Sequence, residues 1–476
     1  MSLGKENTKF DVDRGRAWVV LVAVYSLVIF LCTTLYMNGL YLAVLVEHYQ
    51  EDLTKTSMIG ALNSALLCLL GPVVSVFMDI YSCRTCIVFG GFLLSISYFI
   101  SFFTKNINVY IFTIGIIGGI GNSFAAIPPS VLLAYHFEKW RNTILSFKEV
   151  LVGVGMFIAS PILFWFLDMF GINGSFLIVC GMTLQICVGG LICAPNSEER
   201  KLRKTKCKTQ IKNSNASFKM FLKNVKSTTI LSLRLFKNGS LILFLFSTLA
   251  WNVAFSAFSL HLPRYMVTKG FGNMAVVTVM TIFGLCNTLG RLCAATTVGK
   301  GGLDSNILHI GMLGVLSLSA ILFPLYGRWS SAGFVLAALN GFYSGGPNAL
   351  MTPITISLVG IDKLSSGYGL AFFFCGVGVL TGPPFLGIMY SLTGSYDKSF
   401  MTIGFVVLLG VFCSLMAFSG KYSLEHPETK NTEIMKTVLT DLLEEGNPND
   451  VGNNDAVSVT LTNEEEQTPL ETNEIV

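Results

Sequence analysis

Twelve apolar segments, each long enough to cross a lipid bilayer as a helix, constrain this chain more than any other feature of its sequence. A membrane-crossing helix needs roughly 20 residues, and the segments lack the period-two alternation of membrane-spanning strands. Only 13% of the residues are charged, whereas soluble domains have about a quarter. We therefore predict an all-α integral membrane protein with twelve transmembrane helices. The segments are residues 17–46, 57–78, 85–104, 109–135, 143–167, 174–194, 239–262, 274–298, 305–326, 329–359, 365–393 and 400–419.

A basic, polar stretch of the sequence separates the first six apolar segments from the last six. We predict five parts: a cytoplasmic N-terminal tail (1–16), a six-helix bundle (17–194), a basic cytoplasmic linker (195–238), a second six-helix bundle (239–419) and a cytoplasmic tail (420–476). Because the first part is polar, we expect no cleavable signal peptide. The last part is acidic and rich in Asn and Thr, a composition that favours disorder.

Positively charged residues indicate the orientation of the predicted helices, since cytoplasmic loops carry an excess of Lys and Arg. With both termini inside, 24 of the 32 Lys and Arg residues lie in inner segments and six in outer loops. Twelve of the 24 belong to the linker, so the prediction rests mainly on that stretch. We expect a multi-pass protein of the plasma membrane with this orientation.

The two groups of segments share a pattern of glycine and proline. Gly153 and Gly155 are followed by Pro161, and Gly376 and Gly378 are followed by Pro384 at the same spacing. Parallel repeats of this kind are the plan of major facilitator carriers, which rock two bundles about a central site. The alternative is coincidence, because Gly and Pro are frequent in membrane helices.

Several motifs resemble those of the monocarboxylate transporter family of the major facilitator superfamily. "DRGRAW" keeps the Asp13, Gly15 and Trp18 that open the family's first helix, although two arginines depart from the pattern. "YHFEKWRN" from Tyr135 is a looser form of the family's aromatic-basic cluster. The run "GYGLAFFFCGVGVLTGPPFLGIMYSLTGSYDKSF" from Gly367 resembles the family most closely. The resemblance covers roughly residues 11–420.

This resemblance implies a carrier that moves a small monocarboxylate or related organic solute by alternating access. The partners that it implies are a small organic anion or zwitterion as substrate, membrane lipids, and the single-span accessory glycoprotein that some members need. We expect no nucleic acid partner and no cofactor. A non-transporting membrane sensor with the same fold is the alternative from a different functional class.

Arg291 is the strongest candidate for substrate binding, because it lies inside an apolar segment. A charge near the middle of a bilayer costs from about 3 to more than roughly 10 kcal/mol, so such residues usually face a cavity. A guanidinium matches a carboxylate with two parallel hydrogen bonds. Asn287, four residues earlier, shares its helix face and would orient the guanidinium or the substrate. The alternative is an arginine that stabilises the bundle or reaches the headgroups.

Asn287 also bears on proton coupling. In the proton-coupled lactate carriers the resembling position is an Asp, and a Lys lies in the outer half of the first helix. Here Asn287 cannot titrate, and no Lys or Arg occurs between Arg16 and Lys55. We therefore expect facilitated exchange or uniport in place of the usual lactate–proton mechanism. Proton-linked symport through other titratable groups stays open.

Further residues are candidates for the pocket and the gates. For Lys148 and Glu149, the alternatives are an inner gate or second anion site, and a helix-end pair in which Lys148 reaches the headgroups. Asp79 and Arg84 resemble the superfamily's inner-loop latch. For each pocket candidate, helix packing or lipid contact is an equally good alternative. The gating set is Asp79, Arg84, Lys139, Arg141, Lys148 and Glu149, and the pocket set beside Arg291 and Asn287 is Asn38, Tyr41, Asn252, Tyr343 and Phe373.

Enzymatic and metal-dependent functions are disfavoured. The apolar segments contain no cluster of His, Asp and Glu with a nucleophile, which catalysis would need. Cys83 and Cys86 form a lone C-x-x-C without a second pair or nearby histidines, so a zinc or redox site is not expected. We predict a chain that is not an enzyme and binds no metal.

Overall fold

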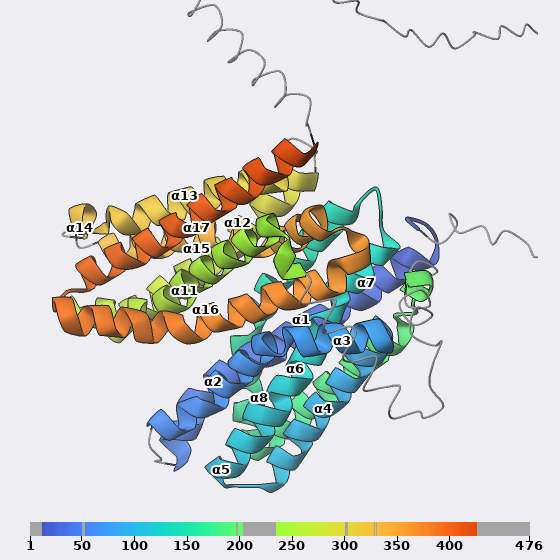
Figure 1. Cartoon of the computed structure of the whole chain (residues 1–476). Coiled ribbons are helices and arrows are strands. Elements are labelled where there is room, and N and C mark those ends of the chain that lie inside the picture. Colours follow the sequence, from blue (N-terminus) through green and yellow to red (C-terminus); the bar gives the residue numbers. More distant parts are fainter. Residues whose placement is uncertain are drawn as a thin grey trace, which may run out of the picture. The chain divides into compact units, whose positions relative to one another are not determined.

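Helices make up all the regular structure in the described part of the chain, which confirms the all-α prediction (Figure 1). The computed structural model describes residues 12–49, 53–196, 199–202, 235–299, 303–327, 329 and 331–425. Most of the predicted linker and of the two predicted tails therefore lies outside the described residues, and the predicted division into five parts stays a prediction. The described helices belong, up to Tyr422 in α17, to one compact unit.

We call the helices before the linker the first half and those after it the second half. The first half contains α1 (Arg16–Tyr49), α2 (Leu53–Leu69), α3 (Gly71–Ile80), α4 (Cys83–Phe103), α5 (Ile107–Tyr110), the π-helix η1 (Ile111–Ile117), α6 (Gly118–Ala126), α7 (Pro128–His136) and α8 (Arg141–Ile192). The second half contains η3 (Leu235–Lys237), α11 (Gly239–Thr268), α12 (Asn273–Gly299), α13 (Ser305–Ile321), α14 (Phe323–Tyr326), α15 (Ala332–Val359), η4 (Ile361–Lys363), α16 (Leu364–Thr393) and α17 (Tyr396–Glu425). Each of the twelve predicted apolar segments overlaps one or more of these helices, in the same order along the chain.

Glycine and proline set the breaks between consecutive helical stretches. In α8, Gly171 has φ 67° and ψ −177°, a backbone conformation that separates two of the predicted segments. A bend of 49° separates Met58–Leu69 from Gly71–Ile80, and a proline follows Gly71 in the first turn of α3. Among the described residues, eight helices are long and apolar enough to cross a membrane, or nine if this bent pair is one span.

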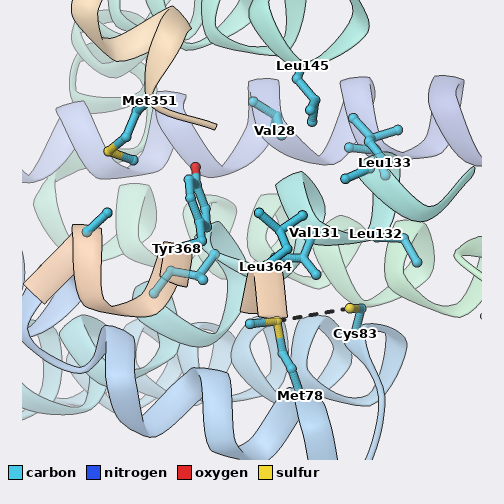
Figure 2. Close-up of a cluster of buried hydrophobic side chains, with 14 of the residues drawn as sticks. Val28, Met78, Cys83, Val131, Leu132, Leu133, Leu145, Met351, Leu364 and Tyr368 are labelled. Atoms are coloured by element: carbon cyan, nitrogen blue, oxygen red, sulfur yellow. Dashed lines mark hydrogen bonds between the residues drawn. The ribbon is translucent and has the colours of Figure 1, made fainter. Parts of the chain in front are cut away.

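The two halves meet along two sets of helices. In one set, α8 of the first half packs against α12 and α15, and in the other set, α2 and α3 pack against α16. A buried hydrophobic cluster includes Val28 and Val131 from the first half and Met351 and Leu364 from the second (Figure 2). The packing of α8 against α12 places the first turns of α8 beside the part of α12 that carries Arg291.

Candidate substrate site

The site begins with two side chains on one face of α12. Arg291 and Asn287 are separated by one helical turn, and each is 5% exposed. The Nε of Arg291 donates a hydrogen bond of 3.0 Å to Oδ1 of Asn287. The amide nitrogen of Asn287 in turn donates to the Ser344 hydroxyl on α15, at 3.1 Å. Asn287 therefore fixes the orientation of the guanidinium, as its spacing from Arg291 predicts.

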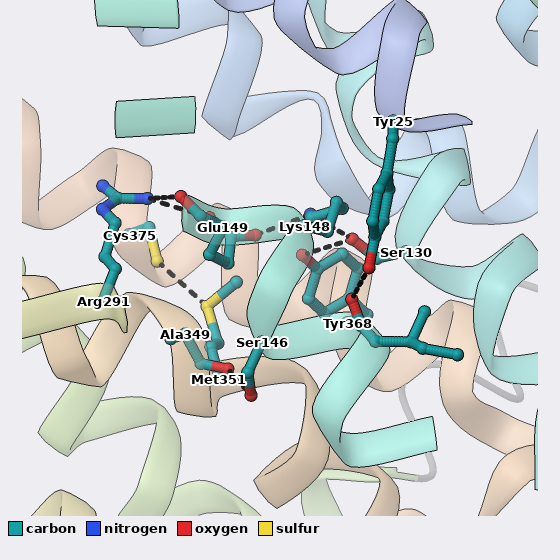
Figure 3. Close-up of polar contacts among 11 residues, drawn as sticks. Tyr25, Ser130, Ser146, Lys148, Glu149, Arg291, Ala349, Met351, Tyr368 and Cys375 are labelled. Atoms are coloured by element: carbon teal, nitrogen blue, oxygen red, sulfur yellow. Dashed lines mark hydrogen bonds and ion pairs between the residues drawn. The ribbon is translucent and has the colours of Figure 1, made fainter. Parts of the chain in front are cut away.

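A carboxylate from the other half of the chain faces the guanidinium. Glu149 lies on α8, and its Oε2 accepts a hydrogen bond of 3.0 Å from Nη1 of Arg291 (Figure 3). The same nitrogen donates to the backbone oxygen of Glu149 at 3.2 Å. The pair joins α8 to α12, and both side chains are largely buried, at 12% and 6% exposure.

Lys148 completes a charged triad with Glu149 and Arg291. Its Nζ lies 2.6 Å from Oε1 of Glu149 and donates to the hydroxyl of Ser130 on α7, also at 2.6 Å (Figure 3). The hydroxyl of Tyr368 on α16 lies 3.0 Å from that of Ser130. Lys148 is only 4% exposed, so the alternative in which it reaches the headgroups is wrong.

The charges of the triad do not cancel. Lys148 and Arg291 are cations and Glu149 is the carboxylate that contacts both, so the triad carries one net positive charge. An unbalanced charge is costly when it is buried, and an added anion lowers that cost. The arrangement therefore suits the binding of a single negative charge, for which a guanidinium provides the matching donors.

The pocket candidates of the first half lie in another hydrophobic cluster. Oδ1 of Asn38 accepts a hydrogen bond of 2.7 Å from the hydroxyl of Tyr98. The hydroxyl of Tyr41 donates to Ser175 at 2.8 Å, and its ring stacks on Phe176 at 4.7 Å between centroids. These contacts hold α1 to α4 and α8, which supports the helix-packing alternative for both residues.

The contacts of Asn252 and Tyr343 are with other residues of the second half and not with Arg291. The Asn252 amide donates to the backbone oxygen of Thr248 within α11, at 2.8 Å. The ring of Tyr343 lies edge-on to Phe342, with 5.2 Å between centroids. Phe373 is 37% exposed on α16, and a side chain facing lipid accounts for it as well as a pocket wall does.

The remaining gating candidates lie near the ends of helices. Oδ1 of Asp79 accepts a hydrogen bond of 2.6 Å from Ser365, which links α3 of the first half to α16 of the second. Arg84 is half-buried in the first turn of α4. The Arg141 Nε donates to the backbone oxygens of Ala134 and Phe137, and the Lys139 ammonium lies 5.8 Å from the centre of the Trp140 ring.

Two of the quoted sequence motifs touch each other. The carboxylate of Asp13, in the motif that opens the first helix, accepts hydrogen bonds from the backbone nitrogens of Glu138 and Lys139. The backbone nitrogen of Asp13 also donates to the backbone oxygen of His136, at 3.1 Å. The turn between α7 and α8 is therefore held by the segment that precedes α1, and this turn leads directly into α8, which carries Lys148 and Glu149.

Sequence reasoning missed Ser130 and Tyr368, which hold Lys148 in place. Each is one of several hydroxyls in a long apolar segment, and such a group can bond to its own helix or to a neighbouring one, so residue type alone does not single it out. Tyr368 lies within the family-like run from Gly367, which is the one signal that could have singled it out. Among the described residues, no three His, Cys, Asp or Glu side chains gather as the ligands of a metal ion would.

The chain is similar to known transporters in sequence. The family model of the Major Facilitator Superfamily matches residues 22–331. Monocarboxylate transporter 14 of Mus musculus is 23% identical, over 85% of this chain and 91% of the relative. Monocarboxylate transporter 9 of Rattus norvegicus is 25% identical, over 85% of this chain and 93% of the relative.

Solved structures show the same fold. The fucose:proton symporter FucP of E. coli superimposes with a TM-score of 0.65 and 13% identity, over 85% of this chain and 99% of that chain. The human organic anion transporter MFSD10 gives a TM-score of 0.60 and 15% identity, over 84% of this chain and 100% of that chain. At these identities the likeness concerns the fold, in which two halves with mainly helical secondary structure pack against each other.

Proposed function

This chain belongs to the monocarboxylate transporter family of the Major Facilitator Superfamily, and from that premise we propose that it carries a small monocarboxylate or related organic solute across the plasma membrane. It is a multi-pass membrane transporter and not an enzyme. We propose alternating access as its mechanism, with both termini in the cytoplasm. Membrane lipids and a single-span accessory glycoprotein remain proposed partners.

One observation carries the proposal: a buried guanidinium that is already bonded to a carboxylate. Arg291 is 5% exposed, is oriented by Asn287, and holds the Glu149 carboxylate at 3.0 Å. A substrate carboxylate in this place would make the same charge-assisted hydrogen bonds. Because the guanidinium is enclosed, a solute can reach it only when α8 and α12 separate, which is the motion that alternating access supplies.

The charge of the triad supports transport without the usual lactate–proton mechanism. One bound monocarboxylate anion would neutralise the net positive charge of Lys148, Glu149 and Arg291. The loaded site would then be neutral without a proton, and Asn287 cannot deliver one. Asp79 with Ser365 and the α7–α8 turn with Lys139 and Arg141 are our proposed gates, since they connect the halves or the helices that carry the site.

A direct test is an uptake screen with the full-length protein reconstituted in lipid vesicles. Radiolabelled lactate, aromatic amino acids, carnitine and creatine cover anions and zwitterions of different sizes, and vesicles without protein are the control. Saturable uptake of at least one solute is the expected result. No flux of any tested monocarboxylate, amino acid or related solute would favour a membrane sensor on the same fold.

The rate of uptake is expected to change less than about twofold when a proton gradient is imposed across the vesicle membrane. The physical reason is that one anion balances the charge of the triad, so no proton needs to accompany it. A pH-sensitive dye inside the vesicles measures proton entry in parallel with uptake. Acidification of the lumen in proportion to substrate uptake would contradict this expectation, and Glu149 would then be the first group to examine as a proton carrier.

A further inference from the structure

We propose that Glu149 is a built-in competitor for the substrate's carboxylate: it occupies Arg291 in the empty carrier and passes entirely to Lys148 when the anion binds. The inference rests on the proposed function, because it takes Arg291 as the substrate's binding group. It adds a residue that sets the affinity of the site. It also assigns to Lys148 the role of holding the displaced carboxylate.

The two oxygens of Glu149 have different partners. Oε2 contacts the Arg291 guanidinium at 3.0 Å, and Oε1 contacts the Lys148 ammonium at 2.6 Å (Figure 3). Loss of the first contact therefore leaves the second intact. A substrate carboxylate can replace Oε2 on Arg291 without leaving Glu149 as a buried anion with no cation.

Lys148 is fixed independently of Arg291. Its ammonium donates to Ser130 at 2.6 Å, and Ser130 lies 3.0 Å from the hydroxyl of Tyr368. Ser130 belongs to α7, in the same half of the chain as Lys148, whereas Tyr368 on α16 and Arg291 on α12 belong to the other half. The ammonium is therefore expected to stay in place when α12 moves, and to retain the carboxylate of its neighbour in sequence.

Repulsion between carboxylates makes Glu149 a competitor for the Arg291 guanidinium, not a second ligand beside the substrate. Two carboxylates on one guanidinium would place like charges side by side in a buried site, which is unfavourable. A substrate anion must therefore remove Glu149 from Nη1 to form both parallel hydrogen bonds. By the same reasoning, the ion pair of Glu149 with Arg291 holds α8 to α12 in the empty carrier until an anion binds.

Four variants of the full-length protein separate competition from net charge. Glu149→Gln removes the competitor and raises the charge of the triad from +1 to +2. Lys148→Met keeps the competitor and lowers the charge to zero. The double variant Lys148→Met/Glu149→Gln removes the competitor at the original charge of +1. Arg291→Ala removes the binding group. Each is purified into lipid nanodiscs, and a single symmetric peak in size-exclusion chromatography shows that it is folded.

The readout is the concentration of a monocarboxylate that gives half-maximal thermal stabilisation. Lactate and benzoate are the probes, and alanine is the matched zwitterion because an ammonium group replaces the hydroxyl of lactate. We expect Glu149→Gln to lower the half-maximal concentration of the anions about tenfold or more. The double variant should also lower the half-maximal concentration. Lys148→Met should raise it, because Glu149 then has only Arg291 as a partner.

Several results would overturn the inference. Equal half-maximal concentrations in the wild type and the double variant would mean that charge alone sets affinity. Tight binding of alanine that is lost in Glu149→Gln would mean that Glu149 binds the substrate's cation. No anion binding to Glu149→Gln, where Arg291 has lost its carboxylate partner, would also exclude competition. If Arg291→Ala bound the anions with wild-type affinity, the proposed function itself would be overturned. If Arg291→Ala lost anion binding but the Glu149 variants kept the wild-type affinity, only the role of Glu149 would be overturned.

Discussion

Replacing Arg291 with alanine is expected to lower substrate uptake about a hundredfold or more while the protein still reaches the membrane. A guanidinium gives a carboxylate two parallel hydrogen bonds, and each bond to a charged group contributes roughly 1.5–3 kcal/mol. Two such bonds correspond to at least about a hundredfold, since roughly 1.4 kcal/mol is a factor of ten. Initial rates of uptake, normalised to the amount of surface-labelled protein, measure the effect.

Two further variants define what the loss means. Arg291→Lys keeps the charge but not the planar fork, so we expect uptake between that of the alanine variant and the wild type. Arg264 lies exposed on α11, and Arg264→Ala is the matched control with uptake within about twofold of the wild type. Unaltered uptake in Arg291→Ala, with normal surface labelling, would remove Arg291 from the substrate site.

Helical periodicity predicts the α12 side of this site and cannot predict the α8 side. Asn287 and Arg291 are four residues apart, so any helix brings them together, and they are bonded in the structure. Glu149 is 142 residues from Arg291 in sequence, and their contact depends on how α8 packs against α12. The sequence indicates that Lys148 and Glu149 are charged residues in an apolar segment, but it does not indicate their partner.

The same limit applies to Asn38 and Tyr41, for which the sequence leaves a pocket role and helix packing as equally good alternatives. Their residue type and their position in an apolar segment predict burial, and both are buried. A buried polar group needs a hydrogen-bond partner, but the sequence does not say which helix supplies it. Here Tyr98 of α4 is the partner of the Asn38 Oδ1 and Ser175 of α8 is the partner of the Tyr41 hydroxyl, so these two atoms join helices within the first half.

The fold itself could be predicted further than the site. Apolar length locates the helices, and the gap between the predicted segments 143–167 and 174–194 coincides with the break at Gly171. The bend between α2 and α3 was not predicted, because a proline after Gly71 is compatible with both a continuous kinked helix and two helices. In the folded protein Gly71 lies at this bend and packs on α16, where an added Cβ would meet the backbone oxygen of Gly369.

Gly345→Ala is expected to destabilise the folded protein by about 1–3 kcal/mol and to reduce uptake strongly, although alanine is the better helix former. Gly345 on α15 faces α12 so closely that an added Cβ would meet the backbone oxygen of Asn287 and lie 3.1 Å from the backbone nitrogen of Arg291. The neighbouring atoms are backbone, so the clash cannot be relieved by a change of rotamer. The helices must separate, and the 3.1 Å bond from Asn287 to Ser344 would be strained.

Gly314→Ala on α13 is the matched control, because an added Cβ there would meet no atom within 4 Å beyond its own stretch of helix. At that position the substitution should be neutral or stabilising, by up to about 1 kcal/mol from helix propensity alone. The two variants make the same chemical change but are expected to change the stability of the folded protein in opposite directions. The midpoint of thermal unfolding in nanodiscs therefore distinguishes the effect of packing from that of helix propensity. If Gly345→Ala matched the wild type in stability and uptake, the close contact of α12 and α15 would not be what orients Asn287. The bond from Arg291 would then have to be what orients Asn287.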